Sequence, residues 1–131
     1  MANLQIILKG AEQLKKKLDT PTIKKPLDDG IKKIAYTLEG LIKEATVVGE
    51  TGYLLSGTHT QITSQFAKVG TNVPYAPFVE YGTERMEARH MEGGTKRLGK
   101  GMFTYGIEQL QKKMGDLLKG IALNIEKKFG D

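Results

Sequence analysis

The last third of the chain carries one continuous stripe of apolar side chains, and this stripe constrains the fold more than any other feature. Between residues 103 and 129 the apolar residues follow one another at intervals of three or four. They are Phe103, Ile107, Leu110, Met114, Leu117, Ile121, Ile125 and Phe129. This spacing places them on one side of an α-helix about 40 Å long. We expect the core of the same chain to cover the stripe, with a second subunit as the alternative.

Two glycines, Gly115 and Gly120, lie within this predicted helix. Each weakens a helix by about 1 kcal/mol relative to alanine. They therefore indicate either a weaker segment or a place where a neighbouring element comes close.

The first part of the chain predicts a short strand and two helices. Leu4–Leu8 is an apolar run typical of a strand, and Ala11–Leu18 has the spacing of a short helix. A break is expected at Asp19–Thr22. Pro26 then opens a longer helix whose apolar residues recur at intervals of three and four up to Ala45.

The middle of the chain predicts a hairpin between two loops. Residues 59–63 and 66–69 alternate in polarity and are rich in β-branched side chains, which favours an antiparallel hairpin. We expect flexible loops at about residues 46–56 and 90–101. The order of elements favours an α+β fold in which helices pack a small antiparallel sheet, with a long C-terminal amphipathic helix.

Length and composition narrow the class of protein. The 131 residues predict a single domain spanning 1–131. The absence of cysteine excludes disulfides, thiolate metal sites and a cysteine nucleophile. No apolar run reaches the roughly 20 residues that span a bilayer, so we expect no membrane partner and synthesis in the cytoplasm. The net charge of +5 is spread along the chain, which is typical of a solvated surface.

The most specific segment is Val69–Thr83, which reads VGTNVPYAPFVEYGT. It contains two of the four prolines in the chain, and proline fixes its own φ and favours an extended residue before it. We expect a turn at residues 72–74. Pro77 should then open a short helical turn that Gly82 ends in a left-handed conformation.

This segment resembles the signature of a family of tailed-phage neck and tail-completion proteins, minor tail components that join head to tail in many long-tailed phages and prophages. A second segment, Glu50–Ser56, resembles the family's run of an acidic residue, Thr and Gly followed by apolar residues and Ser. In order and spacing the resemblance covers about residues 4–129. It departs at His90, which stands where the family usually has proline, and about a dozen extra residues follow before Met102.

The resemblance implies a non-enzymatic structural protein of the virion, with no cofactor, that forms a ring of identical subunits where the tail meets the head. Its partners would be copies of itself, the head connector, and the tail tube or tail terminator proteins. It would lie in the neck or tail of the virion, and in the host cytoplasm before assembly.

The aromatic turn would be a fixed anchor, either in the core or at the seam between subunits. The residues expected at a subunit or partner interface are Tyr75, Phe78, Glu80, Tyr81, Gly82 and Thr83, followed by Thr51, Gly52 and Leu55. Lys96, Arg97 and Lys100 would face duplex DNA passing through the ring, in weak and non-specific contact.

The candidate reactive groups each have a simpler structural interpretation. Gly94, Gly99 and Lys100 match the spacing of a phosphate-binding loop, but glycine follows where the hydroxyl that holds Mg²⁺ is required. We interpret residues 93–101 as a mobile basic loop. His59 and His90 are expected on the surface, since neither Glu87 nor Glu92 is spaced to share a metal with His90.

Catalytic groups are not indicated either. Ser56 and Ser64 do not sit in a glycine-flanked elbow. Glu80 has no visible second acid, so it should pair with Arg85 or Arg89, or cap a neighbouring backbone.

A small basic nucleic-acid-binding module is the alternative function, using the basic loop and the lysine-rich helices. Base stacking on the aromatic turn would call for interleaved basic residues. Residues 69–83 contain none.

Overall fold

A computed structural model describes residues 4–7, 21–49, 52–63 and 66–130. Its elements in chain order are β1 (Leu4–Ile7), α2 (Pro21–Ala45), α3 (Tyr53–Ser56), β2 (Thr58–Ile62), β3 (Ala67–Thr71), α4 (Ala76–Tyr81), β4 (Arg89–Glu92), β5 (Thr95–Leu98) and α5 (Met102–Gly130). The predicted helix at Ala11–Leu18 lies outside the described residues. None of the described helices combines the length and the apolar character that crossing a membrane requires.

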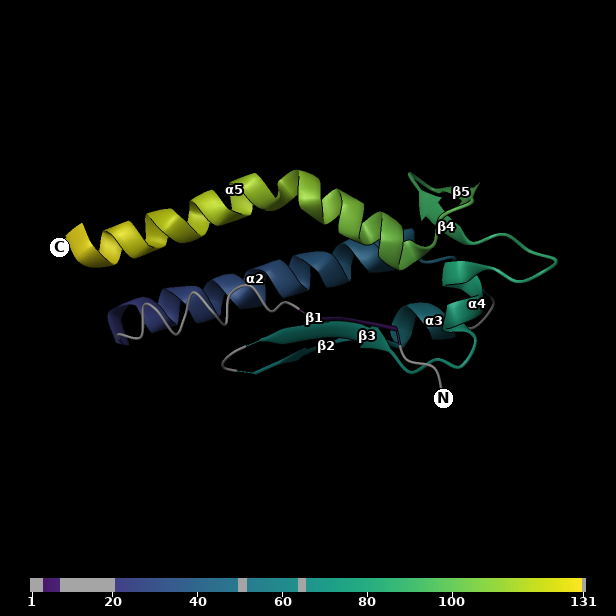
Figure 1. Cartoon of the computed structure of the whole chain (residues 1–131), viewed down its shortest axis with the longest axis horizontal. Helices are drawn as coiled ribbons and strands as arrows, with labels where there is room; N and C mark the ends of the chain where they lie inside the picture. The colour runs from purple at the N-terminus through teal and green to yellow at the C-terminus, as the bar shows by residue number, and fades with distance from the viewer. Residues whose placement is uncertain (1–3, 8–20, 50–51, 64–65, 131) are drawn as a thin grey trace.

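The elements form three layers, with α2 in the middle (Figure 1). The long helix α5 runs antiparallel to α2 along one side, and the three-stranded sheet lies against the other side of α2. The elements α3, α4, β4 and β5 gather at the end of the molecule where α5 begins. The predicted α+β fold with a long C-terminal helix is confirmed.

The sheet is antiparallel, with the strand order β1-β3-β2. Along β3 the residues are alternately buried and half-buried, because every second side chain faces α2. Ala67, Val69 and Thr71 are the buried ones, and Lys68 and Gly70 face outward. The predicted hairpin of residues 59–63 and 66–69 is confirmed as β2 and β3.

Helix α2 starts earlier than predicted. It begins at Pro21 rather than at Pro26, so the break expected at Asp19–Thr22 is wrong for its last two residues. Proline suits the first position of a helix, where its missing N–H has no partner in the helix. Pro26 lies inside the helix and leaves the carbonyl of Thr22 without its usual hydrogen bond.

The two long helices approach closely at two glycines. A Cβ atom at Gly30 of α2 would lie 2.6 Å from the Ile121 side chain, and one at Gly106 of α5 would lie 2.7 Å from the Ile42 side chain. Neither Gly115 nor Gly120 has such a neighbour among the described residues. Of the two interpretations of Gly115 and Gly120, close approach of a neighbour is therefore not seen there in the described part of the chain, and the close approach between the helices is made at Gly30 and Gly106.

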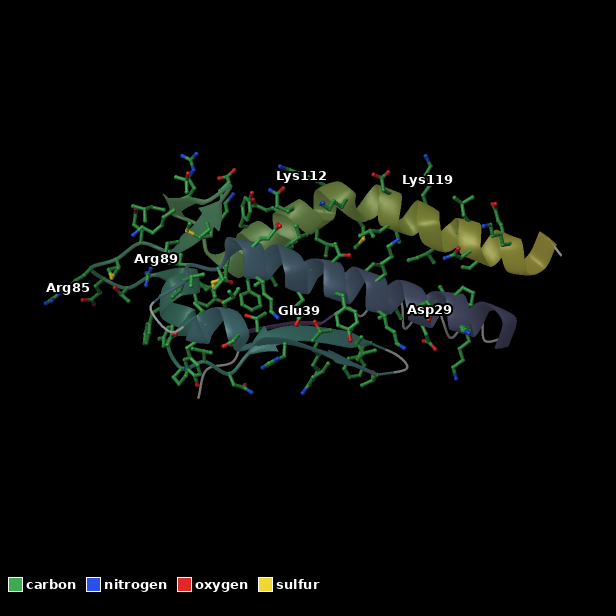
Figure 2. The ribbon with its side chains drawn as sticks, turned by 180° about the vertical axis from the view of Figure 1, so that it is seen from behind. Asp29, Glu39, Arg85, Arg89, Lys112 and Lys119 are labelled. Atoms are coloured by element: carbon green, nitrogen blue, oxygen red, sulfur yellow. The ribbon has the colours of Figure 1, made fainter. Side chains whose placement is uncertain are left out.

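The apolar stripe of α5 is buried mainly near the start of the helix. Phe103 and Leu110 are buried, whereas Ile107, Met114, Leu117 and Ile121 are partly buried against the core. No residue from 111 to 127 is fully buried, and Leu118 and Leu123 are exposed. On the same helix Lys112 and Lys119 project away from α2 (Figure 2).

Both predicted loops contain regular structure. Within residues 46–56, Tyr53–Ser56 forms the helical turn α3. Within residues 90–101, β4 and β5 form an antiparallel hairpin, so the mobile loop predicted there is wrong. Gly93 and Gly94 connect the strands with φ of 60° and 85°, which is the two-residue turn that suits the twist of a hairpin.

Candidate interaction surface

The short helix α4 forms because its prolines and glycine restrict the backbone at both ends. The Ala76 N–H donates to the Val73 carbonyl at 3.1 Å, which closes a turn at residues 73–76, one to two residues later than the turn predicted at 72–74. Pro77 lies in the first turn of the helix, where no N–H is needed. At the other end the Gly82 N–H donates to the Phe78 carbonyl at 3.0 Å. The predicted helical turn is confirmed and begins one residue before Pro77.

One side of α4 is buried and the other presents aromatic rings to solvent. Ala76, Val79 and Glu80 are buried. Tyr75, Phe78 and Tyr81, which recur every three residues, are 41%, 55% and 72% exposed. We call these three side chains the aromatic corner. These exposed rings do not pack in the core, which was one of the two positions predicted for the aromatic turn. The other position, the seam between subunits, stays a prediction.

Glu80 fixes α4 to the start of α5. Its carboxylate accepts hydrogen bonds from the backbone N–H groups of Phe103 at 2.8 Å and Thr104 at 3.0 Å, and from the Thr104 hydroxyl at 2.6 Å. The first N–H groups of a helix have no partner within it and carry partial positive charge. Glu80 therefore caps a neighbouring backbone, which was one of its two predicted roles.

Gly101 makes room for this cap. A Cβ atom at Gly101 would overlap the Glu80 side chain and its Cα atom. The sequence has a glycine directly before the long helix. A glycine there is equally consistent with a flexible chain and with close packing, so the sequence alone did not reveal the contact with Glu80.

Gly82 and Thr83 shape the chain after α4. Gly82 has φ 82° and ψ −176°, which is not the predicted left-handed cap but another conformation that favours glycine. A Cβ atom there would lie 2.6 Å from the Met86 carbonyl oxygen and 2.7 Å from the Ala88 nitrogen. The Thr83 hydroxyl accepts hydrogen bonds from the N–H groups of Arg85 and Met86 at 3.3 and 3.1 Å. These two residues therefore hold the following loop close to the end of α4.

The second set of predicted interface residues, Thr51, Gly52 and Leu55, belongs to the segment around α3, which lies beside the aromatic corner. The rings of Tyr53 in α3 and Tyr75 are 6.1 Å apart between centroids, so α3 and α4 present neighbouring aromatic side chains. Gly52 precedes α3 with φ 62°, and Leu55 is half-buried. Thr51 lies outside the described residues. Tyr53 was not selected from the sequence, because only the fold brings it beside Tyr75.

The three cations proposed to face DNA lie on the β4–β5 hairpin and just after it, next to α4. Lys96 is exposed. The Arg97 Nε lies 3.7 Å from a Glu92 carboxylate oxygen, and the Lys100 Nζ lies 2.6 Å from one of Glu108. Two of the three positive charges are therefore balanced by acids of the same chain.

His90 is buried, which corrects the prediction that it lies on the surface; His59 is exposed as predicted. The His90 Nδ1–H donates to the Lys100 carbonyl at 2.7 Å, and its ring stacks on Tyr105 with the centroids 4.3 Å apart. Its Nε2 lies 3.8 Å from Glu92. Within the described ranges, no group of three or more His, Asp or Glu side chains is arranged to hold a metal ion.

The phosphate-binding interpretation does not fit the local structure either. Gly94 and Gly99 flank strand β5 rather than a loop around an anion. The helix N-terminus that would receive a phosphate already holds the Glu80 carboxylate.

Comparison with protein-family models, with curated proteins and with solved structures found no match to the chain. The resemblance to phage neck proteins therefore depends on the sequence itself, on residues 50–56 and 69–83 and on the order and spacing over about residues 4–129.

Proposed function

We propose that this chain is a structural virion protein of a tailed phage or prophage, a neck or tail-completion component that joins head to tail as a ring of identical subunits. The sequence of residues 69–83 suggests the family. The structural observation that carries the proposal is the aromatic corner, because the most specific segment of the chain directs its large rings outward.

Exposed aromatic side chains on a fixed turn are typical of a binding surface. Tyrosine and phenylalanine are enriched at protein interfaces because they bury much apolar area with few rotatable bonds. The corner is held at the start of α4 by the hydrogen bond from Ala76 to Val73, and near its end by the Glu80 cap and Gly82. A surface that is already ordered loses little entropy on association, which favours binding.

A ring requires each subunit to offer two different surfaces, one to each neighbour. The aromatic corner would be one of them. The head connector and the tail tube or tail terminator proteins would bind the two rims of the ring. The virion neck would be the location of the assembled protein.

The alternative, a small basic nucleic-acid-binding module, has less support from the geometry. Of the three cations proposed to face DNA, Arg97 and Lys100 are paired with acids of the same chain, as described above. A protein that neutralises several phosphates needs unpaired cations and loses affinity steeply as salt rises.

The test replaces two corner residues together, Phe78→Ser and Tyr81→Ser. Both side chains are exposed, so the fold should be retained while association is lost. Tyr36→Ser is the matched control, because Tyr36 on α2 is 54% exposed and Phe78 is 55% exposed. Native mass spectrometry and negative-stain images would give the number of subunits, for the protein alone and mixed with tailless heads of its own phage.

We expect rings or head-bound protein for the wild type and for Tyr36→Ser, and neither for the corner variant. A folded corner variant that assembles like the wild type would contradict the proposal. Strong duplex binding by the monomer that weakens steeply with salt would favour the nucleic-acid-binding alternative.

A further inference from the structure

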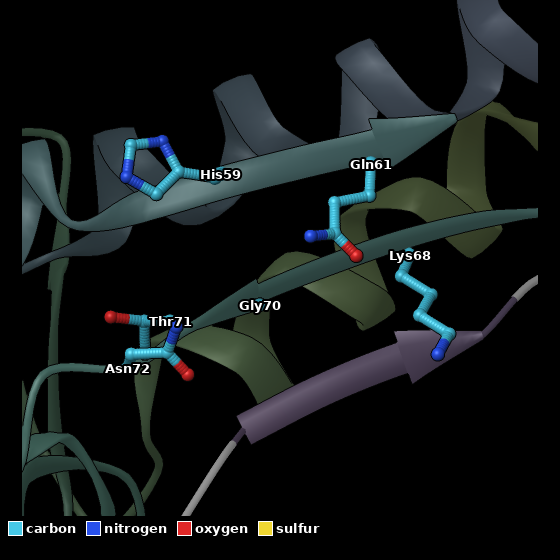
Figure 3. Close-up of a pocket in the computed structure, with 6 residues that line it drawn as sticks. All are labelled: His59, Gln61, Lys68, Gly70, Thr71 and Asn72. Carbon is cyan, nitrogen blue, oxygen red and sulfur yellow. The ribbon is translucent and has the colours of Figure 1, made fainter. Parts of the chain in front are cut away.

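The outer face of the three-stranded sheet, which points away from α2, contains a small hollow (Figure 3). His59 and Gln61 on β2 and Lys68 and Gly70 on β3 lie on this face. The strand register places His59 opposite Gly70 and Gln61 opposite Lys68. Thr71 and Asn72 also line the hollow, at the end of β3. The proposed assembly through the aromatic corner does not use this hollow.

The floor of the hollow is Gly70, and the backbone does not explain why this residue is glycine. At other positions the structure gives a reason for glycine. Gly82 has a positive φ, and Gly30 and Gly106 admit close isoleucine side chains. Gly70 has no positive φ and lies in the central strand, where glycine weakens the strand. A glycine inside a strand often marks a place where a ligand approaches the backbone closely.

The groups around the floor can donate hydrogen bonds to an anion. Lys68 offers an ammonium, and Gln61 and Asn72 offer amide N–H groups. No aspartate or glutamate within the described ranges lines the hollow. Among the described residues the Lys68 ammonium makes no ion pair and lies 5.5 Å from the centre of the Phe66 ring. The amides of Gln61 and Asn72 likewise have no hydrogen-bond partner in the described part of the chain.

The size and charge of the hollow indicate a small monoanion. Its volume is about 90 Å³, whereas sites for drug-sized ligands have about 300–1,000 Å³. Of the lining residues that the structure describes, Lys68 is the one lysine or arginine, so it balances a single negative charge. A phosphate dianion would keep one charge unbalanced.

We propose that this hollow binds a carboxylate of a partner protein, supplied by an exposed aspartate or glutamate side chain. Lys68 balances its charge, and the amides of Gln61 and Asn72 donate to its oxygens. Gly70 lets the group approach the sheet. The proposal does not depend on ring formation, since it concerns a different face of the molecule.

The test uses sodium acetate as the probe, added to the whole protein at constant ionic strength set with sodium chloride. We expect saturable changes in the amide NMR signals of His59, Gly70 and Asn72. Lys68→Met should weaken acetate binding by about tenfold, because it removes a hydrogen bond to a charged group. Lys112→Met removes an exposed lysine on α5 and should change nothing.

A second variant separates binding from folding. Gly70→Val fills the floor of the hollow with a residue that strands favour, so the melting temperature should be equal or higher while the acetate response is lost. Shifts that do not saturate, or that are equal in Lys68→Met and the wild type, would overturn the proposal. Inorganic phosphate or duplex DNA that saturates the same signals at lower concentration than acetate would overturn the choice of carboxylate.

Discussion

The carboxylate of Glu80 accepts two hydrogen bonds from Thr104, one from the backbone N–H at 3.0 Å and one from the hydroxyl at 2.6 Å. Helix α5 has no acidic residue in its own first turn. An acid 24 residues earlier in the chain therefore supplies the negative charge that a helix N-terminus favours. The same contact holds the aromatic corner in place, because Glu80 and the exposed rings belong to one short helix.

Replacing Glu80 by glutamine should destabilise the protein by about 1–3 kcal/mol, since hydrogen bonds to a charged group are lost and a buried N–H would lose its partner. Urea unfolding of the variant gives this free energy. Glu84→Gln is the control, because Glu84 is exposed and should change stability by less than about 0.5 kcal/mol. Equal stabilities of the two variants would show that the cap contributes little.

Gly82→Val should destabilise the fold by at least about 2 kcal/mol, because valine is strained at φ 82° and its Cβ would overlap the Met86 carbonyl. The yield of folded protein and its thermal unfolding measure the effect. Gly49→Val is a suitable control, since it is exposed and nothing lies within 4 Å of a Cβ atom there. A Gly82 variant as stable as the control would contradict this role.

Gly115→Ala and Gly120→Ala should each stabilise the isolated protein by about 1 kcal/mol, because alanine is the better helix former. A Cβ atom at either position meets no described atom within 4 Å. Denaturant unfolding of the two single variants is sufficient. Gly106→Ala is the control with the opposite expected sign. It should destabilise the protein, because its Cβ atom would meet the Ile42 side chain. A loss of stability at Gly115 or Gly120 would reveal a close neighbour at that position.

Deleting residues 93–100 should preserve cooperative unfolding, because every residue of β5 is exposed. Stability should fall by at least about 1 kcal/mol, since joining Glu92 to Gly101 displaces β4 and the buried His90 ring would lose the Lys100 carbonyl as its acceptor. Calorimetry would show both effects. Leu98→Ala, which shortens an exposed side chain of β5, should be nearly neutral. A melt without a cooperative transition would mean that the hairpin is part of the folding unit.

The departure from the sequence predictions at residues 90–101 has a physical explanation. The glycines and cations of this segment are typical of a loop, and alternation of polarity is weak because β5 buries none of its side chains. The one strong local signal was Gly93-Gly94, a pair that favours a two-residue hairpin turn. His90 was placed on the surface for a similar reason, since the ring of Tyr105 and the carbonyl that cover it come from other segments.

The sequence by itself determined the long C-terminal helix, the β2–β3 hairpin and the α4 turn, because periodicity, β-branching and proline act over a few neighbouring residues. The tertiary structure alone decided which distant segments meet. It turned the aromatic rings of α4 outward, brought Glu80 to the start of α5 and placed Gly70 among polar side chains. These outcomes depend on contacts between residues far apart in the chain, and local patterns carry no information about which distant surfaces will meet.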